Sequence, residues 1–238
     1  FGMRPIVKDG ATTVIGDRIA FNDSTGTSQA IGNVIVTDTA QGTTLITNQL
    51  FRENKGNRTL ATGKPLLIIK QESDSLFLTA DTIFSASITP EPINQNSKDS
   101  IKGEKGKTLV KGTKNIALNK SDSSLRYIEA FHHVKIYSDS LQAVCDSLYY
   151  SDKDSIFRLL YNPIVWSKES QITGDTIWLY TRNKKAEKMR VFENSLLISE
   201  LENEIYNQIG SIRMDALFTD GSIDSVRAFG NAQTIYYL

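Results

Sequence analysis

The sequence contains one cysteine, two histidines and five prolines among its 238 residues. A lone Cys145 cannot form an internal disulfide, which fits an intracellular protein or a disulfide-free periplasmic one. Lys plus Arg and Asp plus Glu both number 27, so no excess charge points to nucleic acid or an anionic membrane. No apolar run approaches the roughly 18 residues of a transmembrane segment. No secretory signal is visible at Phe1, as expected for a cytosolic or an already processed chain.

The sequence also lacks the motifs that carry common catalytic chemistry. It has no CxxC pair, no Gly-rich phosphate loop, no GxSxG and no HExxH. His132 and His133 are adjacent, and adjacent strand residues face opposite sides, so we expect no shared metal. Asp146 beside Cys145 should raise the thiol pKa, which makes Cys145 a poor nucleophile. We therefore expect no catalytic site, no metal and no cofactor, and we predict that the protein is not an enzyme.

The sequence does contain short apolar runs rich in β-branched and aromatic residues. Two of them, Ile172–Tyr180 and Met189–Ile198, flank a charged connection within Gln171–Ser199. Their length and composition are typical of strands. Alternation along the second run predicts that Phe192, Asn194, Leu196 and Ile198 share one face, as in a half-buried strand.

This two-strand unit recurs along the chain. The earlier pairs of runs are 14–21 with 31–38, 45–51 with 63–70, 78–84 with 131–138, and 143–150 with 161–167. A weaker last copy runs from 209–218 to 229–238. One polar position marks each of the first five copies at a spacing of about 30 residues, doubled once: Asp17, Asn48, Asp81, Asp146 and Asp175. We interpret these carboxylates as acceptors for turn N–H groups rather than as calcium ligands. The pattern predicts a stack of similar units.

The third unit is interrupted between about residues 90 and 124. This stretch carries seven lysines against four acidic residues, and we interpret it as a solvated insertion. A short hairpin around Thr108–Val110 and Ile116–Leu118 is expected inside it. Helical periodicity is almost absent, although Ser199–Gln208 could form one or two turns. The strands run to Leu238 without a capping element, so we expect the natural chain to continue.

Aligning the copies predicts which residues point inward. Positions at a fixed offset from each marker should face the same interior in every copy. The sixth copy departs from the rule at Arg213 and Gln233. The candidate inward residues are Ile19, Ile35, Leu50, Leu66, Ile68, Ile83, Val134, Ile136, Leu148, Ile164, Trp166, Ile177, Leu196 and Ile198.

Three stretches carry a resemblance to a known family. The segments ITGDTIWLYTRNKKAEKMRVFENSLLIS, IGDRIAFNDSTGTSQAIGNVIVTD and VRAFGNAQTIYYL resemble the OstA-like proteins, which include the periplasmic lipopolysaccharide-transport bridge protein. The resemblance covers residues 1–238 as one domain, apart from the insertion at about 90–124. It implies an all-β, elongated, V-shaped β-jelly-roll whose apolar groove carries the acyl chains of lipid A. It also implies a periplasmic protein, associated with the inner or outer membrane machinery, that stacks through edge strands on other jelly-roll domains.

These observations allow three functions to be compared. The first is a non-enzymatic lipopolysaccharide-binding protein that bridges the periplasm to the outer membrane. The alternative is a structural β-solenoid that serves as a scaffold or protein-interaction module at the cell envelope. A carbohydrate-active β-helix enzyme is disfavoured, because no paired carboxylates occur at matching inward positions. A solenoid would fill its interior with side chains, whereas a groove would leave room.

The inward assignment makes a prediction about stability. Ile177→Asp or Leu196→Asp would bury an unpaired carboxylate and should cost several kcal/mol of unfolding free energy. Arg182→Ala, in the charged connection, should change that free energy by less than about 0.5 kcal/mol. Equal denaturation midpoints for the two classes of variant would contradict the assignment.

Overall fold

The computed structural model describes residues 4–70, 74–88, 125–183, 185–202 and 205–237. Nearly all of them lie in antiparallel strands, and the one helix in these ranges is the 3-10 turn η1 (Lys55–Asn57). The hairpin expected around 108–118 lies outside the described residues. The ends of that interruption are held together, because the backbone N–H of Ile88 donates to the carbonyl oxygen of Leu125 at 2.8 Å.

The strands fall into a long series of hairpins. The first nine are β1 (Ile6–Asp9), β2 (Thr12–Ile15), β3 (Arg18–Asn22), β4 (Thr27–Asp38), β5 (Thr43–Glu53), β6 (Arg58–Thr62), β7 (Leu66–Lys70), β8 (Ser75–Thr79) and β9 (Thr82–Ser87). The rest are β10 (Arg126–Tyr137), β11 (Gln142–Ser151), β12 (Ile156–Leu160), β13 (Ile164–Ser167), β14 (Ser170–Thr173), β15 (Thr176–Arg182), β16 (Lys185–Glu202), β17 (Ile205–Thr219), β18 (Ser222–Phe229) and β19 (Gln233–Ile235).

These strands form one continuous sheet that is bent into two layers. Each long strand pairs with one short strand along its first half and with another along its second half. In β4, residues 27–31 pair with β3 and residues 35–38 pair with β2. In β10, residues 126–131 pair with β9 and residues 135–137 pair with β8. We call layer A the one that contains β3, β6, β9, β12, β15 and β18, and layer B the one that contains β1, β2, β7, β8, β13, β14 and β19.

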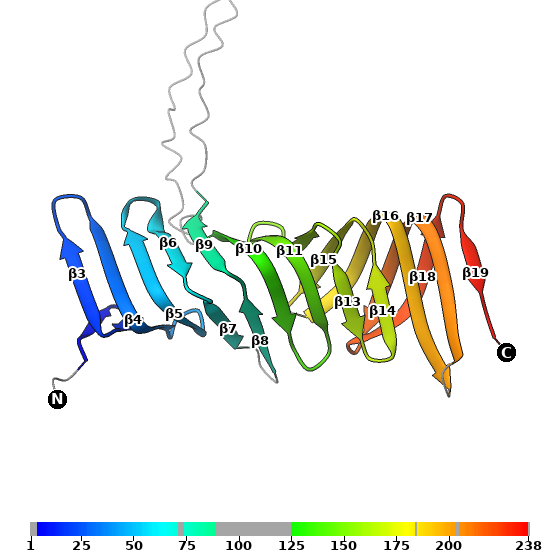
Figure 1. The fold of residues 1–238 in the computed structure, drawn as a ribbon, viewed down its shortest axis with the longest axis horizontal. Helices are drawn as coiled ribbons and strands as arrows, with labels where there is room; N and C mark the ends of the chain where they lie inside the picture. The colour runs from blue at the N-terminus through cyan, green and yellow to red at the C-terminus, as the bar shows by residue number, and fades with distance from the viewer. Residues whose placement is uncertain (1–3, 71–73, 89–124, 184, 203–204, 238) are drawn as a thin grey trace, which may run out of the picture.

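The strands lie side by side along the long axis of the molecule, and the two chain ends lie at opposite ends of it (Figure 1). Successive units therefore stack in sequence order. The predicted fold class, an all-β, elongated, V-shaped jelly-roll of repeated two-strand units, is confirmed.

The bend between the layers is built from pairs of residues with left-handed backbone. Two consecutive residues have positive φ at eight places in the described chain, and two of these, Gly56 with Asn57 and Asp220 with Gly221, lie in turns away from the bend. The six pairs at the bend are Gly32 and Asn33, Gly63 and Lys64, His132 and His133, Tyr161 and Asn162, Glu193 and Asn194, and Gly230 and Asn231. Glycine adopts this conformation without strain, and asparagine and histidine adopt it more readily than most residues. Three of these pairs also break the strand register, as β-bulges do.

The polar marker residues lie at this bend and hold it together. Asn33 Nδ2 donates to Asp17 Oδ2 at 2.9 Å. In the fifth unit, Asn194 Nδ2 likewise donates to Asp175 Oδ1 at 3.0 Å. The prediction that these carboxylates accept turn N–H groups is therefore wrong for these two residues. They accept side-chain donors from the neighbouring strand's left-handed pair, and so they link successive strands across the bend.

The two histidines belong to the same bend and are not extended strand residues as predicted. Both have left-handed backbone, and each reaches a different neighbour. Nδ1 of His132 lies 3.1 Å from Asp146 Oδ1, and Nδ1 of His133 lies 2.8 Å from Asp81 Oδ2. The hydrogen bond to Asp146 raises the pKa of His132. Each histidine thus replaces the asparagine of other units as the partner of a marker aspartate.

The inner faces of the two layers pack against each other most fully in the second half of the chain. One core cluster joins Ile83, Leu148 and Met214 of layer A to Leu78 and Leu197 of layer B. The first half has a much smaller buried cluster, of Ala30, Val34, Leu50 and Ala61. Three of these four side chains are alanine or valine, so they fill little of the space between the layers. The interior is therefore less completely filled toward the N-terminal end.

The helical turns expected at Ser199–Gln208 do not form. β16 continues to Glu202 and β17 begins at Ile205, with Ile198 opposite Gln208 and Ser199 opposite Asn207. Because these two long strands pair, the backbone N–H and C=O groups of the segment form hydrogen bonds between the strands. This pairing outweighs the local helix propensity.

The outer face of layer A carries a shared carboxylate at Asp215. Arg190 donates to it twice, from Nε and from one terminal nitrogen, each at 2.8 Å, and Lys188 Nζ lies 3.1 Å away. The hydrogen bond from Arg190 is the main reason why the pKa of Asp215 is lowered to about 2. Planar two-point contacts of this kind are stronger than ordinary surface ion pairs.

This network predicts a pH dependence of stability. A carboxyl pKa lower in the folded than in the unfolded state stabilises the protein above the unfolded pKa, and the contribution is lost as pH falls toward about 2. Asp215→Asn should therefore lower the unfolding free energy at pH 7 by on the order of 1 to 2 kcal/mol. The difference from the parent protein should shrink between pH 4 and pH 2 in denaturation series. Asp224→Asn, at an exposed position of β18, is the control for charge removal, and a constant difference across pH would contradict the prediction.

Candidate functional site

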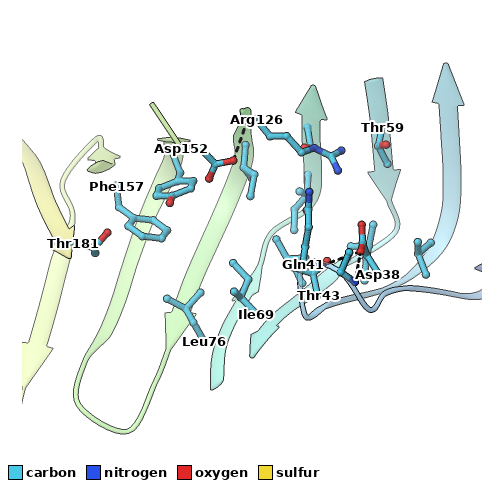
Figure 2. Close-up of a pocket in the computed structure, with 18 of the residues that line it drawn as sticks. Asp38, Gln41, Thr43, Thr59, Ile69, Leu76, Arg126, Asp152, Phe157 and Thr181 are labelled. Carbon is cyan, nitrogen blue, oxygen red and sulfur yellow. Dashed lines mark hydrogen bonds between the residues drawn. The ribbon is translucent and has the colours of Figure 1, made fainter. Parts of the chain in front are cut away.

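A cavity of about 770 Å³ lies between the two layers. Its lining residues come from strands far apart in the sequence, from Thr12 in β2 to Ala186 in β16. Figure 2 shows the middle of this space, with residues of both layers around it. The cavity occupies the first half and the centre of the molecule, where the buried core is smallest.

The inner part of the cavity is apolar, and we call it the floor. Layer A contributes Leu50, Ile83, Ile128, Phe157 and Leu179, and layer B contributes Val14, Val36, Leu45, Leu67, Ile69, Leu76 and Leu141. Most of these side chains are only partly buried, because no further side chain packs over them. Apolar surface left open inside a fold is unusual and marks a place where an apolar partner can bind.

The edge of the cavity is polar, and we call it the rim. Its residues stand at strand ends and turns, on the side away from the bend. Asp38 ends β4 and Arg126 begins β10, and both lie far along their strands from the left-handed pairs. The rim consists of Asp38, Gln41, Thr43, Ser138 and Ser140 from layer B and of Arg52, Asn57, Thr59, Ser85, Ser87, Arg126, Asp152, Thr181 and Lys185 from layer A.

The two layers meet on the rim side near the C-terminal end. Gly221, in the turn between β17 and β18 of layer A, has a φ of 75°, and a Cβ there would lie 2.9 Å from the Cβ of Ser140 in layer B. Ser167 Oγ donates to the Gly221 carbonyl oxygen at 3.2 Å. A glycine is needed at this point both for the backbone conformation and for the close approach. This contact joins the layers beyond one end of the cavity.

Half of the predicted inward residues do point between the layers. Leu50 and Ile83 line the cavity, and Ile19 packs beside the small N-terminal cluster. The remaining four are buried in the larger core and do not line the cavity: Val134, Ile136, Leu148 and Ile177.

The other half lie on the outer face of layer B, so their inward assignment is wrong. In each of these strands the adjacent residue is the one that is buried or lines the cavity, and neighbours along a strand face opposite sides. Val36, Leu67, Val165 and Leu197 are thus inward. The misplaced residues are Ile35, Leu66, Ile68, Ile164, Trp166, Leu196 and Ile198.

The error has a plain cause in the sequence. The runs Leu66–Lys70 and Ile164–Ser167 carry large apolar residues on both faces, so alternation does not say which face is inward. The left-handed pairs give a better reference position, because the residue directly after the pair is buried at Val34, Val134 and Ser195.

Two of the misplaced residues instead line a hollow of about 480 Å³ on the outside of the molecule. Trp166 and Ile198 form part of it, together with Tyr206 and Gln208. The indole Nε1 of Trp166 donates to Gln171 Oε1 at 2.9 Å, so its polar group already has a partner.

The described residues show no cluster suited to metal or nucleophilic chemistry. In these ranges no group of three or more His, Cys, Asp or Glu side chains could hold a metal ion. Burial raises the pKa of Cys145 to about 12, so the predicted poor nucleophile is confirmed, with burial and not Asp146 as the main cause. Within the same ranges, no helix is long and apolar enough to cross a membrane.

Comparison with known proteins gives matches among solved structures alone. No protein-family model matches the sequence, and no curated protein matches it. Among solved structures, the chain is similar to LptH from Pseudomonas aeruginosa, described as the LptA-homologous periplasmic component of a lipopolysaccharide transport device. The identity is 11%, with 99% of this chain and 96% of that chain covered, at a TM-score of 0.27.

The revised inward face predicts the outcome of substitutions at two adjacent leucines. Leu197 is buried in the core, whereas Leu196 lies on the outer face. Leu197→Asp should lower the unfolding free energy by about 3 kcal/mol, because it buries a carboxylate without a partner. Leu196→Asp should cost less than about 1 kcal/mol. Urea denaturation of the two variants measures both changes. A larger loss of unfolding free energy for Leu196→Asp would show that Leu196, and not Leu197, points inward.

Proposed function

We propose that the cavity between the layers binds the acyl chains of a lipid and that the protein is a non-enzymatic lipid carrier. The observation that supports this most directly is the apolar floor, which borders about 770 Å³ of open space inside an otherwise packed fold. That volume falls within the roughly 300 to 1,000 Å³ of small-molecule sites. The alternative, a scaffold with an interior filled by side chains, does not account for the unfilled space.

The energetics of such binding need no specific polar contact to the chain. Each methylene transferred from water to the floor contributes roughly 0.8 kcal/mol, so a chain of several methylenes binds through burial alone. The polar rim, with Arg52, Arg126 and Asp152, would keep the headgroup in water at the mouth. Binding is therefore passive, without a covalent step.

We further propose that the lipid is lipopolysaccharide and that the protein acts in the periplasm, in a bridge to the outer membrane. This part rests on the resemblance of the three sequence stretches to the OstA-like proteins. The end strands are compatible with assembly on other jelly-roll domains: among the described residues, β3 pairs only with β4, and β18 and β19 pair only with β17. Exposed edges of this kind accept a strand from another chain.

A photo-crosslinking experiment on adjacent residues tests the proposal. A photoreactive amino acid at Val36 or Ile69 would lie on the floor, and the same group at Ile35 or Ile68 would lie on the outer face of the same strand. Lipopolysaccharide should be captured from the first two positions and not from the second two. Equal capture at all four positions, or capture at none, would contradict the proposal and favour the scaffold.

A further inference from the structure

Two arginines of the rim face the same part of the cavity. Arg52 lies on β5 and Arg126 on β10, with β6 and β9 between them. The facing residues on those two strands carry short side chains: Thr59 is opposite Arg52 and Ser85, and Ser87 is opposite Arg126. All five line the cavity. Short hydroxyl side chains between two long cationic ones leave space over this part of layer A.

Neither guanidinium has an ion pair within 4.0 Å in the part of the chain that the structure describes. Nε of Arg126 is buried without any hydrogen-bond partner there. Five other arginines have carboxylate partners, in the pairs Arg4 with Asp17, Arg58 with Glu53, Arg158 with Asp154, Arg182 with Glu187 and Arg190 with Asp215. Arg18, Arg213 and Arg227 have no such partner among the described residues, but they do not line the cavity. The two rim arginines therefore differ from these five.

The nearest acidic groups are engaged by backbone donors. Oδ1 of Asp38 accepts the N–H groups of Ala40 and Gln41 at 2.9 and 3.0 Å. Oδ2 of Asp152 accepts the backbone N–H of Arg126 at 3.0 Å, the contact drawn as a dashed line in Figure 2. Asp38 thus shapes a turn at the rim, and Asp152 holds the first residue of β10. Neither forms an ion pair with the guanidinium of Arg126.

The electrostatics of Arg126 agree with a missing anion. Burial, and then the positive charge of Arg52, lower the pKa of Arg126, while Asp38 and Asp152 act in the opposite direction. A guanidinium whose charged form is disfavoured by burial and by a neighbouring cation is stabilised by an anion that contacts both cations. A guanidinium presents a planar fork of donors that fits phosphate or carboxylate oxygens at two points.

We propose that Arg52 and Arg126 bind the anionic headgroup, phosphate or carboxylate, of the amphiphile whose chain lies on the floor. This inference rests on the proposed function and adds to it the charge of the ligand and the residues that recognise it. Thr59, Ser85 and Ser87 lie between the two cations and supply hydroxyl donors to the same oxygens. The ligand is thereby oriented, with its headgroup at the rim of layer A and its chain toward Leu67 and Ile69.

The test compares two amphiphiles of equal chain length and a free anion. Dodecyl phosphate, neutral dodecyl maltoside and inorganic phosphate are titrated, below the micelle concentrations of the first two, against a neutral apolar fluorophore bound to the protein. The variants are Arg52→Gln and Arg126→Gln. The control is Arg58→Gln, which removes the same charge from β6 on the opposite face, next to Thr59. Thermal unfolding of each variant checks that it is folded.

The parent protein should bind dodecyl phosphate more tightly than dodecyl maltoside. Each rim substitution should weaken dodecyl phosphate about tenfold, the loss expected for one charged hydrogen-bonded contact, and should leave dodecyl maltoside unchanged. Arg58→Gln should change neither affinity.

Equal dodecyl phosphate affinity in the rim variants and in Arg58→Gln, with maltoside still bound, would overturn the headgroup site but not the proposal that the cavity binds a lipid chain. If the parent protein binds neither amphiphile, both the lipid-binding cavity and the headgroup site are contradicted. Inorganic phosphate that competes as well as dodecyl phosphate would show a free-anion site and overturn the headgroup assignment.

Discussion

The structure depends on the bend that folds one continuous sheet into two facing layers. At each unit a pair of left-handed residues turns the strand. At three of these pairs an aspartate of a neighbouring strand accepts a hydrogen bond from the pair, as Asp17 does from Asn33 and Asp175 from Asn194. A non-glycine residue in this conformation costs on the order of 1 kcal/mol, so the repeated cross-strand hydrogen bonds help to hold it. Because every unit bends at the same place, the apolar faces of both layers face each other along the whole molecule.

The same bend leaves two different interiors in its two halves. In the second half, large side chains such as Met189 and Met214 are fully buried and fill most of the space between the layers. Ser167 and Gly221 also join the layers on the side opposite the bend there. In the first half the buried residues are small, and the layers remain apart around the cavity. An apolar floor below a polar rim suits an amphiphile. The two rim arginines, which have no ion pair among the described residues, favour an amphiphile whose headgroup is negatively charged.

The fold could be predicted from the sequence to a large extent, and the cavity only in part. The repeat of apolar runs and polar markers indicated an all-β stack, and inward residues such as Leu50 and Ile177 follow directly from it. The second strands could not be assigned in the same way, because Leu196, Leu197 and Ile198 are all apolar and alternation has no contrast there. The signal that would have helped is the recurring asparagine or histidine of the left-handed pair, since the next residue points inward. The unpaired state of Arg126 depends on contacts between distant strands, and no local pattern in the sequence reports it.

The central claim is that the space between the layers holds a lipid chain. The most direct measurement is a crystal structure of the protein with an alkyl phosphate that carries bromine at the end of its chain, located by anomalous scattering. The bromine should lie between the layers, near Leu67, Ile69 and Leu76, with the phosphate at Arg52 and Arg126. Bromine density on the outer face of layer B, such as the hollow at Trp166, with none between the layers, would contradict the account.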